Sequence, residues 1–70
     1  MSTYVYKDPN KKFELDITEL RGCVRVTLTD KGVTAQLCTA KNLEAAFEYV
    51  ATMFATGGKP APRRDEWVQL

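Results

Sequence analysis

Trp67 is the residue whose type points most directly to binding, because it is the only tryptophan of the chain. Arg63 and Arg64 precede it, and tryptophan and arginine are enriched among the residues that dominate the affinity of protein interfaces. In one interpretation Trp67 therefore anchors a partner protein. In another it folds back and closes the open side of a small core. A third alternative is that Glu66–Leu70 adds as a strand to the sheet of a second copy.

Tyr4 and Tyr6 form a second candidate group. Aromatic side chains beside a basic groove bind single-stranded nucleic acid by stacking on its bases. The alternative is that one face of their strand packs in the core and the two tyrosines cap the sheet. Arg25, on the central part of the predicted sheet, is a further candidate for contact with a partner. The lysines that would supply positive charge to a nucleic-acid site are Lys7, Lys11, Lys12, Lys31 and Lys41.

Residues that support catalysis are sparse. The chain has no histidine, the side chain that most often serves as the base of a nucleophile. Glu14 and Asp16 could work as a pair of carboxylates, but we interpret them as solvated strand residues. Two cysteines without histidine cannot make a four-ligand zinc site. We therefore predict a non-enzymatic protein without metal or cofactor.

Cys23 and Cys38 are predicted to project from neighbouring strands on the outer face of the sheet. The strand pairing predicted below places Arg25 opposite Cys38, so the cysteines are diagonal neighbours. Diagonal partners lie about 7–8 Å apart, which exceeds the usual Cα separation in a disulfide of about 4.4–6.8 Å. Both thiols are therefore expected to be reduced.

The length of 70 residues allows one small domain. A domain of this size buries only about 60% of the surface of its unfolded chain, and its core rarely supplies more than about 3–5 kcal/mol. Self-association as a homodimer is the expected additional stabiliser. We find no signal peptide and no apolar run long enough to span a membrane, so the predicted location is the cytoplasm.

The charge is nearly balanced, with ten basic and nine acidic residues and a formal net charge of +1. Nucleic-acid binding depends on lysine and arginine that neutralise phosphates, and this chain has little surplus. The balance favours another protein as the partner over nucleic acid.

Four segments alternate between apolar and polar residues, or carry residues typical of strands, and predict an antiparallel meander. Arg21-Gly22 joins the second strand to the third, which places Ile17 opposite Val26. For the next turn we prefer a loop of even length, either Lys31-Gly32 alone or Asp30–Val33, because a slip of one residue would turn apolar side chains outward. It places Leu28 opposite Ala35 and Val26 opposite Leu37. The predicted strands are Thr3–Lys7, Lys12–Leu20, Cys23–Thr29 and Val33–Thr39.

A helix follows, with Asn42 as its N-cap and Gly57-Gly58 as its end. Its apolar stripe and the apolar face of the sheet should form one core. The predicted fold class is α+β in the order β-β-β-β-α. Residues 1–58 form a single domain in this prediction, and residues 59–70 form an extended tail that contains prolines and the tryptophan anchor. The stripe consists of Leu43, Ala46, Phe47, Val50, Ala51 and Phe54.

In length and architecture the chain resembles the small inhibitors that phages carry against host defences, anti-CRISPR proteins among them. The resemblance implies an inhibitor that binds another protein and assigns no residue a role. The predicted function is therefore a protein-binding module, either an inhibitor or an adaptor, with a small nucleic-acid-binding domain as the alternative. The predicted contact residues are Trp67, Arg63, Arg64, Tyr4, Tyr6 and Arg25.

Overall fold

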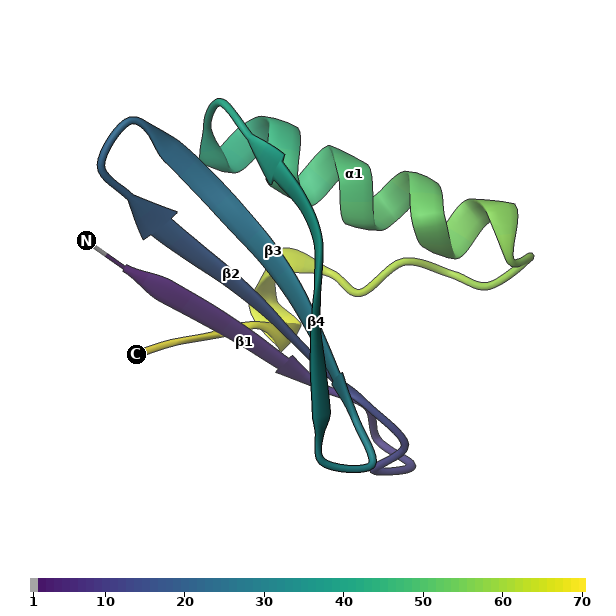
Figure 1. Cartoon of the computed structure of the whole chain (residues 1–70). Coiled ribbons are helices and arrows are strands. Elements are labelled where there is room, and N and C mark those ends of the chain that lie inside the picture. The colour runs from purple at the N-terminus through teal and green to yellow at the C-terminus, as the bar shows by residue number, and fades with distance from the viewer. Residues whose placement is uncertain (1) are drawn as a thin grey trace.

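A computed structural model describes residues 2–70 of the chain. One antiparallel sheet with the strand order β4-β3-β2-β1-β5 carries a single helix on one face (Figure 1). The α+β prediction and the four-stranded meander are confirmed, and the structure adds a short fifth strand beside β1. The elements in chain order are β1 (Thr3–Lys7), β2 (Glu14–Leu20), β3 (Cys23–Asp30), β4 (Val33–Ala40), α1 (Leu43–Thr56), the 3-10 helix η1 (Arg64–Glu66) and β5 (Val68–Gln69).

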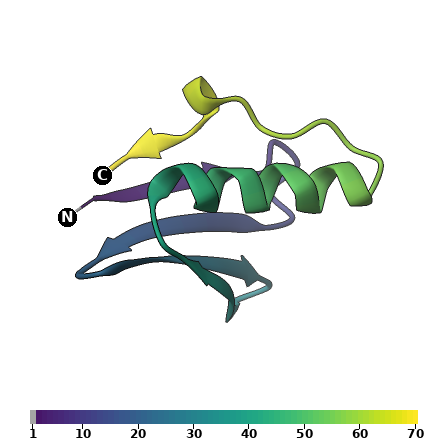
Figure 2. The same cartoon turned by 90° about the horizontal axis from the view of Figure 1, so that it is seen from above.

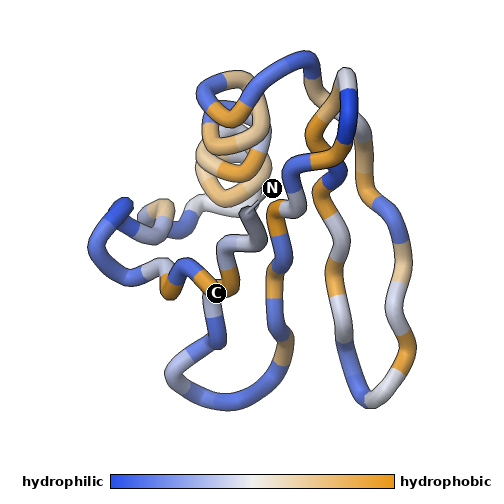
Figure 3. The backbone as a smooth tube through the Cα atoms, turned by 90° about the vertical axis from the view of Figure 1, so that its left-hand side faces the viewer, coloured by the Kyte–Doolittle hydropathy of each residue, from blue (hydrophilic) through white to orange (hydrophobic). Residues whose placement is uncertain are grey.

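The pairing of β2 with β3 follows the apolar alternation, which Figure 3 shows along the strands as alternating hydrophobic and hydrophilic positions. Ile17 lies opposite Val26, as predicted. This pairing keeps the apolar residues of both strands on the face that α1 covers, where Ile17 and Val26 are fully buried. The alternation therefore determines which face of the sheet becomes the core.

The predicted pairing of β3 with β4 is confirmed near the turn, but it is wrong further along the two strands. Leu28 lies opposite Ala35, as predicted, but Val26 lies opposite Cys38 and not opposite Leu37. The cause is a β-bulge, because Leu37 is an extra residue between the partners of Val26 and Thr27. An extra residue moves every later side chain of a strand to the other face.

The bulge also corrects the prediction for the two cysteines. Cys38 packs against the core on the side of α1, whereas Cys23 shares the face of Arg25, on the other side of the sheet. Both cysteines are free. Burial raises the pKa of the Cys38 thiol above its ordinary value. The two thiols therefore lie on opposite faces of the sheet and are not diagonal neighbours.

The hairpin turns are as short as predicted. Asp30 pairs with Val33, so Lys31 and Gly32 alone form the loop between β3 and β4. Both have positive φ angles, 53° for Lys31 and 79° for Gly32, as a two-residue type I′ turn requires. Lysine adopts this conformation less readily than glycine or asparagine does.

Helix α1 has a defined cap at each end. The Asn42 side chain accepts a hydrogen bond of 2.8 Å from the Ala45 amide, as predicted for an N-cap. At the other end the Lys59 amide donates to the Phe54 carbonyl and the Gly58 amide to the Ala55 carbonyl. This pair of bonds is the Schellman motif, which satisfies carbonyls that the helix leaves without partners.

The core lies between α1 and the sheet, and residues 59–70 contribute to it. This C-terminal segment runs back along α1 and ends beside β1 (Figure 2). Strand β5 pairs with β1 of the same chain, with Val68 opposite Val5, so the segment does not need a second copy to form a strand. Ala46 and Val50 of the predicted stripe are buried, whereas Ala51 is exposed. Whether residues 1–58 fold without this segment stays a prediction.

Candidate partner-binding surface

The sheet has one face that α1 does not cover, which we call the outer face. Cross-strand pairing places its residues in three rows across β1 to β4 and a fourth, shorter row in which Leu20 lies opposite Cys23. Threonine is the commonest type, so the surface is polar and mostly uncharged. The outer-face residues of the four long strands are Thr3, Val5, Lys7, Glu14, Asp16, Thr18, Leu20, Cys23, Arg25, Thr27, Thr29, Thr34, Gln36 and Thr39.

Asp16 and Arg25 lie near the middle of the outer face, on neighbouring strands. Thr18 lies opposite Arg25 and Thr27 lies opposite Asp16, so the two charged residues are diagonal neighbours. Asp16 Oδ1 and Arg25 Nε are shielded from solvent, and neither has a hydrogen-bond partner among the described residues. A shielded polar group without a partner costs about 1–3 kcal/mol.

The pKa of Asp16 reflects its partly buried position beside Glu14. Burial raises the pKa of the Asp16 carboxyl above its ordinary value, and the carboxylate of Glu14 raises this pKa further. Glu14 precedes Asp16 by two residues on the same face of β2. The outer face therefore holds an acceptor and a donor that are partly desolvated before any partner is present.

Three of the predicted contact residues are part of the core side of the molecule. Trp67 is only 8% exposed, and its ring meets that of Phe47 edge-on at a centroid distance of 5.3 Å. Tyr6 is buried too and lies 5.7 Å from the Trp67 ring. Tyr4 is partly buried and packs edge-on against Phe47 at 5.8 Å. In this structure Trp67 closes the core, which is the second of the interpretations given above.

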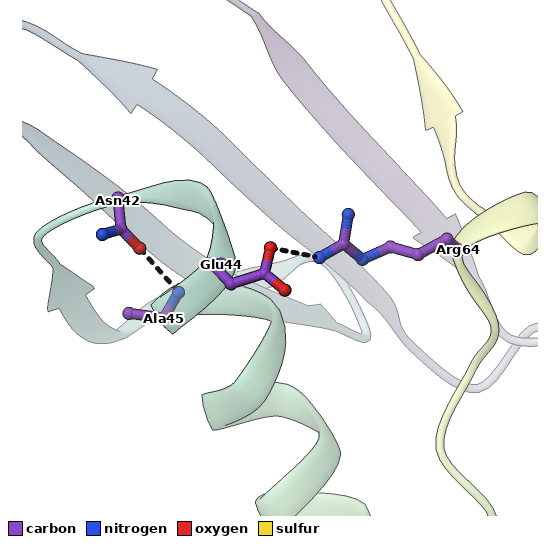
Figure 4. Close-up of polar contacts among 4 residues, drawn as sticks. All are labelled: Asn42, Glu44, Ala45 and Arg64. Carbon is purple, nitrogen blue, oxygen red and sulfur yellow. Dashed lines mark hydrogen bonds and ion pairs between the residues drawn. The ribbon is translucent and has the colours of Figure 1, made fainter.

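Arg64 joins the C-terminal segment to the start of α1. Its Nη2 atom lies 3.2 Å from Glu44 Oε2 (Figure 4), and its guanidinium lies 3.8 Å from the centre of the Phe47 ring. Arg63 instead lies within 3.4 Å of Asp65 and within 3.6 Å of Glu66, in an exposed setting. Arg64 thus links the C-terminal segment to α1, whereas the ion pairs of Arg63 stay within the C-terminal segment.

The fold brings together lysines that are far apart in the sequence. The connection between β1 and β2 and the turn between β3 and β4 lie at the same end of the sheet (Figure 1), where they line shallow hollows around Phe13. The sequence did not indicate that Lys59 would join this group, because only the path of the chain after α1 brings it there. Lys41 does not join it. We call the group of Lys7, Lys11, Lys12, Lys31 and Lys59 the lysine end.

The described residues hold no group of three or more histidine, cysteine, aspartate or glutamate side chains that could bind a metal ion. Among residues 2–70 no helix is long and apolar enough to cross a membrane. Comparison of the chain with protein-family models, with curated proteins and with solved structures found no match.

Proposed function

We propose that the chain is a non-enzymatic protein-binding module, an inhibitor or an adaptor, and that its outer face meets the partner. The observation that carries this proposal is the pair of shielded polar atoms on Asp16 and Arg25 that have no hydrogen-bond partner among residues 2–70, in the middle of the face that α1 does not cover (Figure 1). If the Asp16 and Arg25 side chains turn toward a partner, one that donates a hydrogen bond to Asp16 and accepts one from Arg25 would remove the cost of leaving Oδ1 and Nε unpaired.

The composition of the outer face supports a polypeptide as the partner. Its two basic residues, Lys7 and Arg25, are balanced by Glu14 and Asp16, so it offers no surplus charge to a polyanion. Threonine hydroxyls can both donate and accept hydrogen bonds, which suits the mixed polar groups of a protein surface. A role like that of the phage inhibitors of host defences, and a cytoplasmic location, are part of this proposal.

The test is affinity capture from the native host with three baits. The wild type is compared with Asp16→Asn/Arg25→Gln, which removes both charges at similar size, and with Glu48→Gln, which changes an exposed carboxylate on α1. We expect a partner that the wild type and Glu48→Gln retain and that the double variant loses. A partner retained equally by all three folded baits would refute the outer face as the binding surface.

The lysine end favours a second candidate function, a nucleic-acid-binding domain. Its five lysines are accompanied by Asp8, Glu14 and Asp30 in the same hollows, which leaves a small positive surplus. Phe13, which is partly exposed, could stack on a base.

A salt titration with a single-stranded oligonucleotide separates the two candidates. Binding driven by phosphates should weaken steeply between about 50 and 200 mM salt and should weaken further in Lys11→Gln/Lys12→Gln. Absence of binding at low salt, or a flat response to salt, would exclude the second candidate and leave the first one untouched.

A further inference from the structure

The two edges of the sheet are very different. At one edge the two-residue strand β5 pairs with Tyr4 and Val5 of β1. At the other edge β4 has eight residues and, within residues 2–70, no strand pairs with its outer side. A free edge strand presents unpaired amide and carbonyl groups that can pair with another strand.

The first half of strand β4 lacks the features that usually protect a free edge. Natural sheets block such edges with charged residues, proline, short strands or bulges. The sequence of β4 is Val-Thr-Ala-Gln-Leu-Cys-Thr-Ala, without a charge or a proline. Its bulge at Leu37 disturbs only the second half. The first half, residues 33–36, is regular, and all four of its residues are exposed, Val33 to 69%.

The turn determines which backbone groups of β4 point outward. Lys31 and Gly32 form a two-residue loop, and in such a turn the Val33 amide bonds to the Asp30 carbonyl. Antiparallel strands alternate between pairs that exchange hydrogen bonds and pairs that do not. The backbone amides and carbonyls of Val33 and Ala35 therefore point toward β3. Those of Thr34 and Gln36 point toward the free edge.

We propose that β4 pairs with β4 of a second copy about a two-fold axis at Ala35. In this register Thr34 of each copy exchanges two hydrogen bonds with Gln36 of the other, which gives four in total, and Ala35 lies opposite Ala35. The register places polar residues opposite polar ones and Val33 near Leu37. It is the symmetric register that keeps every hydrogen-bonded pair within the regular half of the strand.

The properties of the β4 edge favour a second copy of the chain as its partner. An uncharged strand meets its own copy without repulsion between like charges, which destabilise a sheet when they lie opposite each other. The axis lies perpendicular to the sheet, so the two sheets become one continuous sheet of ten strands with both helices on one face. The outer faces of the two copies then join through Thr34 and Gln36. This inference rests on β4 alone and does not depend on the partner proposed above.

Charge substitutions at the axis give the first test. In Ala35→Lys two lysines meet at the axis, and in Ala35→Glu two glutamates do, so each variant alone should raise the dissociation constant of the dimer about fivefold. A mixture of the two variants should form a mixed dimer at least as tight as the wild-type dimer. Ala55→Lys, at an exposed position on α1, should leave the dissociation constant unchanged. Sedimentation equilibrium measures these dissociation constants, and native mass spectrometry identifies the mixed dimer by its mass.

Removal of one outward amide gives the second test. Gln36→Pro deletes an amide that has no partner in the single copy and should weaken the dimer about thirtyfold, because two bonds are lost across the axis. Gln36→Ala, which keeps the amide, is its control. Hydrogen exchange, measured at a concentration between the dissociation constants of the two proteins, should be slower at the Thr34 and Gln36 amides in the wild type than in Ala35→Lys. A wild type that is monomeric at millimolar concentration, or a dimer that Ala35→Lys and Gln36→Pro leave intact, would overturn the proposal.

Discussion

Trp67 connects three parts of the molecule through its ring. It packs against Phe47 of α1 and Tyr6 of β1 and stands directly before β5. The buried ring supplies apolar surface that the short sheet and single helix cannot provide alone. A domain of this size has little stability to spare, so the contribution of one large side chain is a major part of the whole.

We expect Trp67→Ala to lower the free energy of unfolding by about 3–5 kcal/mol, the usual cost of truncating a buried aromatic residue. This loss is comparable with the whole stability of the domain, so the variant should be largely unfolded at 25 °C. Urea denaturation followed by circular dichroism measures the effect. Leu70→Ala, at a position that is 78% exposed, should stay within about 0.5 kcal/mol of the wild type. Equal stability of the two variants would contradict the core role of Trp67.

Asp16 makes stability depend on pH. Its pKa is raised above the ordinary value of 3.8 in the folded chain, so the folded state holds the proton more tightly than the unfolded state does. Linkage then requires the free energy of unfolding to fall as the pH rises from the unfolded pKa through the folded one.

We therefore expect Asp16→Asn to be more stable than the wild type at pH 7. The difference should shrink as the pH falls below the unfolded pKa of Asp16, where the carboxyl is protonated in both states. Thermal unfolding measured from pH 3, below the ordinary carboxyl pKa of about 4, up to pH 7 shows this difference in stability. Glu48→Gln serves as the control. A variant that is less stable than the wild type at pH 7 would mean that the Asp16 charge is stabilised within the fold.

At the scale of the elements, the turn between β3 and β4 has a favourable residue, Gly32, and an unfavourable one, Lys31, at its two positions of positive φ. Gly32 adopts its positive φ without cost, but Lys31 has a φ of 53°. The left-handed conformation costs most residues about 1–2 kcal/mol, and asparagine tolerates it better. Lys31 also belongs to the lysine end, so a substitution there changes the local charge as well as the backbone preference.

We expect Lys31→Asn to raise the free energy of unfolding by up to about 1 kcal/mol, because Asn-Gly is the preferred pair in a type I′ turn. Lys12→Asn removes the same charge from the same end at a residue without positive φ, and it should not stabilise the chain. Denaturant titration of both variants at high and low salt separates the backbone effect from the charge effect. An equal gain in both would assign the effect to charge.

At the scale of the whole molecule, the C-terminal segment packs against the rest of the fold. Residues 59–70 supply β5, the buried Trp67 and the contact between Arg64 and Glu44. The predicted division after residue 58 would leave the edge of β1 without a neighbour and the core open on that side.

We expect a chain truncated after Gly58 to be unfolded, because it loses these contributions together. Circular dichroism and the dispersion of amide resonances in NMR spectra measure this. If the truncated chain instead stays folded and loses its partner, residues 59–70 form a recognition tail, as the alternative prediction for Trp67 holds.

Much of the fold followed from local patterns, and much of the candidate surface did not. The alternation in residues 14–29 gave the correct pairing of β2 with β3, and Asn42 gave the correct start of α1. The bulge at Leu37 was missed, because the local sequence is as regular there as elsewhere in β4. The burial of Tyr6 and Trp67 was left open, because either an interface or a core accepts aromatic residues.

The amino-acid sequence by itself determined the four-strand meander, the helix and its caps, because hydrophobic period, turn residues and capping residues act over a few neighbours. Only the tertiary structure decided that the chain end pairs with β1, that Cys38 turns to the core and that five lysines meet at one end. These features depend on contacts between segments distant in sequence. The same packing leaves Asp16 Oδ1 and Arg25 Nε without a hydrogen-bond partner among the described residues and leaves the edge of β4 free of a neighbouring strand there. The two proposals depend on these two surfaces.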